Sequence, residues 1–191
     1  MDIIEDCFID EILQSEANAI LQDLMVSTKL MKYFIDFNKE KIDKSILYIK
    51  NIFEEFYNMG TLKVLKYQTD KTLYGYALYF VYPQNNHMYL HKIFVFEKYR
   101  KQGMGTIMLN KLCESDFKIT LVCPNNKINF YNNQGFNFIQ PFSLPKTDEY
   151  KLSKNLYQGL SLMSNSTQQD NGIMFLLDDI DINNIANIMK I

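Results

Sequence analysis

A short loop with two glycines, two basic residues and a threonine carries the clearest chemical signal in the sequence. Arg100, Lys101, Gly103, Gly105 and Thr106 stand where a predicted strand gives way to a predicted helix. Glycine lets a ligand approach the backbone closely. The N–H groups that open a helix lack intrahelical partners and attract anions. The loop therefore predicts a cradle for a phosphate or pyrophosphate group.

Two common phosphate motifs do not fit this loop. A P-loop requires a lysine before its Ser or Thr, but here Gly105 is followed directly by Thr106. A dinucleotide fingerprint requires a third glycine three residues after Gly105, and this chain has Met108 at that position. The run Arg100-Lys101-Gln102-Gly103-Met104-Gly105 instead resembles the R/Q-x-x-G-x-G/A signature of the GNAT acetyltransferase superfamily. The strand before it and the helix after it stand in the order that this family has.

A second run resembles the next motif of the same family. Residues 125–136 read Asn-Asn-Lys-Ile-Asn-Phe-Tyr-Asn-Asn-Gln-Gly-Phe, which is similar to an Asn-initiated helix ending in F-Y-x-x-x-G-F. The family's asparagine falls where this chain has Pro124, so Asn125 or Asn126 must take its place. The resemblance covers residues 61–156; the helical N-terminus matches loosely and the tail does not match. Two motifs in order weigh against the alternative that the glycines merely close a turn.

The resemblance implies where acetyl-CoA binds and how it reacts. Acetyl-CoA would lie across the splayed ends of two parallel strands, with its pantetheine along the backbone of Phe94 and Val95. Asn126 would make a further coenzyme contact. A primary amine would attack the thioester directly in a ternary complex, with the Val95 N–H on the carbonyl oxygen and Tyr131 protonating the thiolate. The pyrophosphate would rest on Arg100, Lys101, Gln102, Gly103, Met104, Gly105 and Thr106.

His91 is the candidate general base. Strand alternation predicts that Tyr89, His91, Ile93 and Val95 share one face, and imidazole titrates near neutral pH. A structural histidine, or a chain of waters with no single base, are the alternatives; for Tyr131 the alternative is a packed helix aromatic. His87, at the start of the same strand, is expected at the surface.

The elements that position these residues form an α/β fold with a mixed sheet. The pattern predicts two or three helices over residues 8–60, with breaks near 27–28 and 38–43. An antiparallel meander then continues into a central parallel strand pair flanked by helices. The predicted strands are residues 61–68, 73–82, 87–96, 118–122 and 136–140, with 149–156 as one more candidate, and the helices between them are 103–114 and 126–134.

The predicted organisation is one GNAT-like acetyltransferase domain and a tail. The domain is residues 1–157, with a helical part at 1–60 and the coenzyme-binding sheet at 61–157. The tail, 158–191, would be a polar linker at 161–172 and an amphipathic helix at 181–191 with Asp181 as its N-cap. It could dock on its own domain or on a partner, and the sequence is compatible with a homodimer.

Composition narrows the partners. A formal net charge of −2 argues against a nucleic-acid partner. Cys7, Cys113 and Cys123 lie far apart and only two histidines are present, so no metal site is expected and a reducing cytoplasm is the expected location. No apolar stretch is long enough for a membrane span.

These observations favour an acetyl-CoA-dependent N-acetyltransferase whose acceptor is a small-molecule amine or a protein amino group. One rival is a non-catalytic CoA-binding relative that acts through protein interaction. Another is a toxin-type acetyltransferase acting on aminoacyl-tRNA, which would call for a dense basic run; the sequence has none.

Overall fold

The computed structural model describes residues 8–27, 31, 38–166 and 174–190. Their chain forms two compact units. The first comprises the described residues of Met1–Asn58, Ser143–Gln158 and Leu176–Ile191, and the second those of Met59–Phe142 and Gly159–Phe175.

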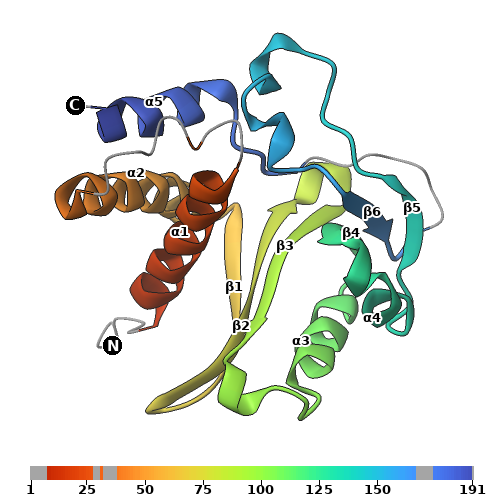
Figure 1. The fold of residues 1–191 in the computed structure, drawn as a ribbon. Helices are drawn as coiled ribbons and strands as arrows, with labels where there is room; N and C mark the ends of the chain where they lie inside the picture. The colour runs from red at the N-terminus through yellow and green to blue at the C-terminus, as the bar shows by residue number, and fades with distance from the viewer. Residues whose placement is uncertain (1–7, 28–30, 32–37, 167–173, 191) are drawn as a thin grey trace. The chain divides into compact units, whose positions relative to one another are not determined.

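The second unit is built on a six-stranded mixed sheet in the order β1-β2-β3-β4-β6-β5 (Figure 1). The first three strands form the predicted antiparallel meander, and β3 then pairs with β4 in parallel. Aromatic and β-branched residues dominate these segments, as is typical of strands. The predicted α/β fold with a central parallel pair is thus confirmed. The strands are β1 (Leu62–Thr69), β2 (Thr72–Tyr82), β3 (His87–Val95), β4 (Lys118–Pro124), β5 (Asn137–Pro141) and β6 (Leu160–Ser164).

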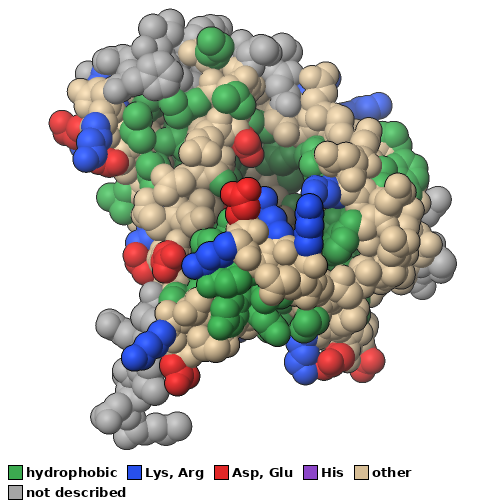
Figure 2. All heavy atoms as spheres, turned by 60° about the horizontal axis from the view of Figure 1, so that its bottom comes forward, with side chains coloured by type: hydrophobic (Ala, Val, Ile, Leu, Met, Phe, Trp, Pro, Cys, Tyr) green, Lys and Arg blue, Asp and Glu red, His purple; other side chains and the backbone are tan. Residues whose placement is uncertain are grey.

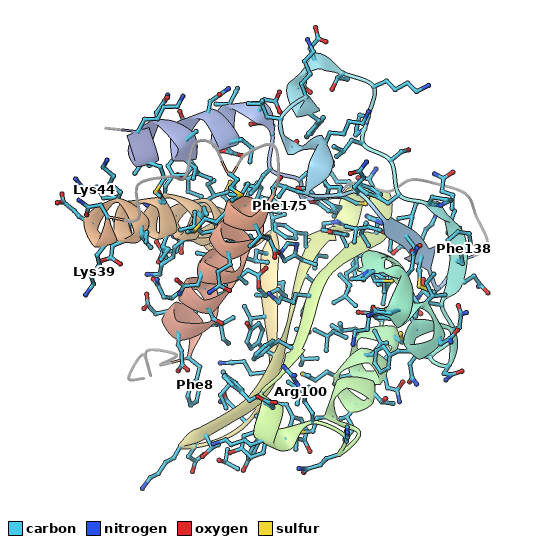
Figure 3. All side chains as sticks on the ribbon, in the orientation of Figure 1. Phe8, Lys39, Lys44, Arg100, Phe138 and Phe175 are labelled. Carbon is cyan, nitrogen blue, oxygen red and sulfur yellow. The ribbon has the colours of Figure 1, made fainter. Side chains whose placement is uncertain are left out.

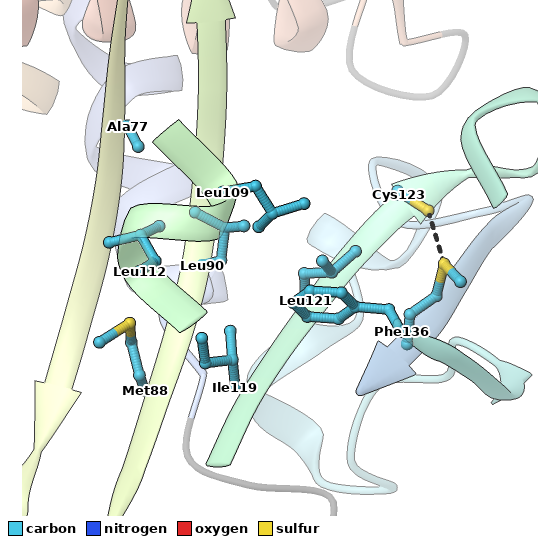
Figure 4. Packing of buried hydrophobic residues seen from close by; sticks show 10 residues of the cluster. Ala77, Met88, Leu90, Leu109, Leu112, Ile119, Leu121, Cys123 and Phe136 are labelled. Carbon is cyan, nitrogen blue, oxygen red and sulfur yellow. Dashed lines mark hydrogen bonds between the residues drawn. The ribbon is translucent and has the colours of Figure 1, made fainter. Parts of the chain in front are cut away.

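Two helices of this unit cover one face of the sheet: α3 (Met104–Cys113) and α4 (Ile128–Asn132). Leu109 and Leu112 of α3 pack with Met88 and Leu90 of β3, and the same cluster continues into β4 (Figure 4). Burial of these apolar side chains fixes α3 on the sheet. The position of α3 then determines where the loop in front of it lies.

The first unit contains three helices, α1 (Ile9–Val26), α2 (Lys39–Asn58) and α5 (Asp179–Lys190). Both α1 and α5 contact α2. The Tyr48 hydroxyl of α2 donates to Asp181 Oδ1 at 2.9 Å and accepts from Asn184 at 2.8 Å. The C-terminal helix therefore docks on the chain's own N-terminal part.

A second anchor joins α5 to residues 143–158. The Asp179 carboxylate accepts backbone N–H groups from Lys151 at 2.9 Å, Leu152 at 2.8 Å and Ser153 at 3.3 Å. A carboxylate that accepts several N–H bonds is a strong local clamp. It holds a segment that has little regular structure of its own.

Four predictions for these regions were wrong. Residues 149–156 form two short 3₁₀ turns, Asp148–Tyr150 and Ser153–Asn155, and no strand. The predicted linker at 161–172 begins inside β6, and its residues 167–172 lie outside the described chain. Asp178, not Asp181, caps α5, because its Oδ1 accepts the N–H groups of Ile180 and Asp181. His87 is not at the surface: it is 3% exposed.

The predicted break at 38–43 is also shifted, since α2 already begins at Lys39. The break near 27–28 falls at Ser27, which ends α1, while Thr28 lies outside the described residues, as does Cys7. Cys113 and Cys123 are both free thiols.

Candidate active site

The parallel strands β3 and β4 are paired only over their first residues. Their register runs from His87 opposite Lys118 to Leu90 opposite Leu121, although β3 continues to Val95. Within the described residues, β3 and β4 form no further residue pairs after Leu90. The facing backbone edges therefore separate, and a ligand can enter between them.

A cavity of about 750 Å³ opens at this separation, within the usual size range of small-molecule sites. The ends of β3 and β4, the loop before α3 and the first residues around α4 form its walls. The lining residues are His91, Lys92, Ile93, Val95, Tyr99, Arg100, Lys101, Gly103, Met104, Gly105, Thr106, Val122, Cys123, Pro124, Asn126, Lys127, Phe130 and Tyr131. Of the residues predicted from the sequence, only Phe94 and Gln102 do not line it.

A β-bulge at His91 changes the expected face of the residues that follow it in β3. Leu78 pairs with Lys92 but Tyr79 pairs with Leu90, so His91 is the inserted residue. Its ring lies 6.0 Å from that of Tyr89, whereas Ile93 packs on the opposite face with the α3 cluster. The prediction that Tyr89, His91, Ile93 and Val95 share one face was therefore wrong: the bulge shifts the alternation by one residue.

The backbone of Val95 points toward the cavity side of β3. The Phe96 N–H donates to the Tyr74 carbonyl at 3.1 Å, and bonded and non-bonded pairs alternate along an antiparallel ladder. The Val95 N–H and carbonyl consequently turn away from β2. By the same alternation the backbone of Phe94 is directed toward β2.

The loop before α3 is shaped by two left-handed residues, Lys101 with φ 63° and Gly103 with φ 78°. Such a conformation turns successive N–H groups toward one point and makes an anion-binding concavity. The α3 helix follows directly, so its free N–H groups and its dipole act at the same place. This geometry is suited to a phosphate group.

Arg100 fixes the loop against the end of β3 (Figure 3). Its Nε donates to the Val95 carbonyl at 3.0 Å, and its guanidinium carbon lies 5.9 Å from the centroid of the Phe94 ring. The sequence predicted only a ligand contact for Arg100, but its side chain also binds the loop to the end of β3.

The two glycines of the loop differ in what they require. A Cβ on Gly103 would meet no heavy atom within 4 Å, but its positive φ disfavours any other residue. A Cβ on Gly105 would lie 3.7 Å from Phe130 Cζ and 3.9 Å from Ile93 Cγ2, which are ordinary contacts. The fold therefore needs Gly103 for its backbone, whereas Gly105 leaves space in the cavity wall.

Tyr131 stands on α4 with its ring 5.0 Å from that of Phe130 and 6.0 Å from that of Phe136. Burial, with a smaller contribution from Cys123, raises the pKa of Tyr131 to about 12. The phenol thus keeps its proton at neutral pH and can donate a hydrogen bond into the cavity.

The two candidate asparagines are separated by their contacts. Asn125 Oδ1 accepts from the Ser161 hydroxyl at 2.7 Å, so Asn125 holds β6, and Asn126 lines the cavity. Sequence reasoning missed the cavity residues of β4, such as Cys123, and the basic Lys127. The signal was available for both, since they stand at the carboxyl end of a parallel strand and in the turn after it.

The charge of the cavity wall is basic. Lys92, Arg100, Lys101 and Lys127 contribute cations, and no acidic residue belongs to the lining of this cavity. Figure 2, which brings this end of the molecule forward, shows Lys and Arg side chains near the centre of the face, with a few acidic ones beside them. A ligand with several negative charges is favoured here.

Within the described ranges, no three His, Cys, Asp or Glu side chains form a group that could hold a metal ion. None of the helices in the same part of the chain is long and apolar enough to cross a membrane.

Comparison with known proteins agrees with this architecture. The model of the acetyltransferase (GNAT) family matches residues 30–136, more than half of the chain. None of the curated protein sequences matches this chain. An N-acetyltransferase from Staphylococcus aureus Mu50 is similar in structure, with a TM-score of 0.52 and 16% identity over 81% of this chain and 96% of that one.

Two further solved structures are less similar. A mutant of spermidine N-acetyltransferase SpeG from Vibrio cholerae has a TM-score of 0.48 and 12% identity, over 62% of this chain and 73% of that one. PaiA N-acetyltransferase from Thermoplasma acidophilum, solved in complex with coenzyme A, has a TM-score of 0.45 and 15% identity, over 79% of this chain and 92% of that one.

The fold, a mixed sheet with one parallel pair in its middle, is that of the GNAT acetyltransferases. The chain belongs to the acetyltransferase (GNAT) family, whose members use acetyl-CoA.

Proposed function

We propose that this protein is an acetyl-CoA-dependent N-acetyltransferase that moves the acetyl group to a primary amine by direct attack in a ternary complex. The observation that carries the proposal is the meeting, in one cavity, of the open backbone edge of Val95, the loop that starts α3 and the phenol of Tyr131. Coenzyme A carries several phosphates, which suit the basic wall and the left-handed turns at Lys101 and Gly103.

Acetyl-CoA, when bound, supplies an activated acyl group as a thioester. The residues of the chain would then stabilise the negative charge that develops in the reaction and take the proton that the amine loses. The Val95 N–H, which points away from β2, would donate to the acyl carbonyl oxygen as negative charge develops there. The N–H groups of Gly103, Gly105 and Thr106 would hold the pyrophosphate.

Tyr131 would donate a hydrogen bond to the departing sulfur. Its pKa of about 12 exceeds that of an ordinary thiol, about 8.5, so complete transfer of the phenolic proton to the released thiolate is uphill. The role that fits is a hydrogen bond that strengthens as the thiolate forms. Proton release from the amine would fall to His91, directly or through water.

The test is thiol release from acetyl-CoA in the presence of an amine panel: spermidine, free lysine, an aminoglycoside and an alanyl peptide. We expect release with at least one acceptor, and a loss of about 10²-fold or more in kcat for Tyr131→Phe. Tyr131→Phe keeps the ring and its packing, so acetyl-CoA should still raise the midpoint of thermal unfolding.

The outcomes separate the rivals. Stabilisation by acetyl-CoA without release for any amine would favour a non-catalytic CoA-binding protein. No stabilisation at all would overturn the coenzyme assignment.

A further inference from the structure

The His91 imidazole stands inside a set of aromatic rings. Its centroid lies 6.0 Å from Phe80, 6.0 Å from Tyr89 and 5.7 Å from Phe175, at interplanar angles of 84°, 69° and 84°. Since His91 is the inserted residue of a β-bulge, strand alternation does not set the direction of its side chain. Packing against these rings does.

Phe175 differs from the other two rings because it does not come from the sheet. It lies in the chain between β6 and α5 (Figure 3), 84 residues after His91. Its ring stacks on Phe80 with a centroid distance of 5.0 Å and an interplanar angle of 5°. His91 is thus perpendicular to two parallel rings, in the edge-to-face arrangement that aromatic quadrupoles favour.

The chain just after Phe175 is held in place. Two residues later, the Leu177 N–H donates to the Tyr157 hydroxyl at 3.0 Å, and Leu177 is 3% exposed. Phe175 lies two residues before this bond, and its own ring packs edge-to-face on the imidazole.

We propose that Phe175 is a positioning residue, which holds the His91 imidazole at the cavity so that it meets the acceptor amine. The proposal rests on the proposed function, because His91 has an acceptor to meet only if the chain transfers acetyl groups. It assigns a role in the acceptor half of the site to Phe175, which the sequence motifs do not cover.

The first arm of the test observes His91 directly. The sequence has two histidines, so histidine-selective ¹³C labelling gives two ring signals. His87, whose Nε2 lies 2.8 Å from Thr120 Oγ1, is the internal reference. Phe175→Leu should shift and broaden the His91 signal, since it removes a ring current and a wall, and should leave His87 in place. Phe138→Leu, at a ring 46% exposed on β5, is the matched control and should change neither signal.

The second arm is a double-mutant cycle in acetyl transfer with the fastest acceptor of the panel. Phe175→Leu should lower kcat by about 10–100-fold with the KM for acetyl-CoA unchanged, and Phe175→Tyr should restore it. In a His91→Ala background, Phe175→Leu should cause no further loss.

Three results would overturn the proposal. They are an unmoved His91 signal in Phe175→Leu, multiplicative losses in the double variant, and full activity in His91→Ala. If acetyl-CoA does not stabilise the wild-type protein, the proposed function itself has failed, and the first arm still reports whether Phe175 orients His91.

Discussion

Gly105→Ala tests whether a ligand approaches the backbone at the start of α3. The added methyl group would make ordinary contacts with Phe130 and Ile93, and alanine is a better helix former than glycine by up to about 1 kcal/mol. The ligand-free variant should therefore unfold at or above the wild-type midpoint. The same methyl group takes up space in the cavity beside residue 105, where a bound coenzyme would lie against the backbone.

The expected size follows from linkage. Acetyl-CoA at a hundred times its Kd stabilises the folded protein by about 2.7 kcal/mol, which is roughly 5–11 °C for a domain of this size. An extra methyl in a filled site costs about 1–3 kcal/mol. That cost weakens Kd about 5- to 160-fold, so the coenzyme-dependent rise in Tm should shrink by roughly a third to nine-tenths in Gly105→Ala at the same concentration.

The assay is differential scanning fluorimetry with and without acetyl-CoA, with Gly103→Ala as the comparison. Gly103→Ala places a non-glycine residue at φ 78° and should lose about 1–2 kcal/mol of stability without any ligand. If Gly105→Ala keeps the full coenzyme-dependent rise, no ligand lies close to this residue. If it is as unstable as Gly103→Ala in the absence of ligand, the steric reasoning is wrong.

Three other substitutions test the packing of the fold and the titration of Tyr131. Gly75→Ala would put a Cβ 2.5 Å from a carbonyl oxygen of the neighbouring strand, and we expect a loss of about 1–3 kcal/mol in urea unfolding. Asp179→Ala removes the acceptor for three backbone N–H groups and should cost about 1–3 kcal/mol, whereas Asp148→Ala, at a 92% exposed side chain, should change stability little. Burial raises the pKa of Tyr131 to about 12 from an ordinary value of 10.0, so stability present below pH 10 is lost as the pH rises toward 12; unfolding free energies measured from pH 9 to 11.5 should decline less steeply in Tyr131→Phe.

Much of the sheet could be predicted because each of its first three strands neighbours the next in the chain. β6 could not, because its signal is tertiary. Ser161 and Ser164 read as linker residues, yet both are at most 2% exposed and donate to Asn125 Oδ1 and the Ile119 carbonyl. Serine is tolerated in a central strand when a partner on another element satisfies its hydroxyl, and no local pattern reveals that partner.

The candidate site divides in the same way. The anion cradle depends on a local run of glycines and basic residues, so the sequence predicts it together with most of the cavity wall. The bulge at His91 depends on the register between β2 and β3, and Phe175 reaches His91 from a distant segment. Strict alternation along β3 consequently assigned Ile93 to the wrong face.

Strand β6 is synthesised after β5 but lies between β4 and β5. During translation the meander of β1 to β3 can form as its strands emerge, whereas β4 has one side unpaired until residues 160–164 have left the ribosome. An unpaired strand edge is a template for aggregation, and pairing over so long a loop is slow. We therefore expect the half of the sheet that carries the cavity to fold last, and a chain that stops before residue 160 to aggregate although the loop at 100–106 and the run at 125–136 are intact.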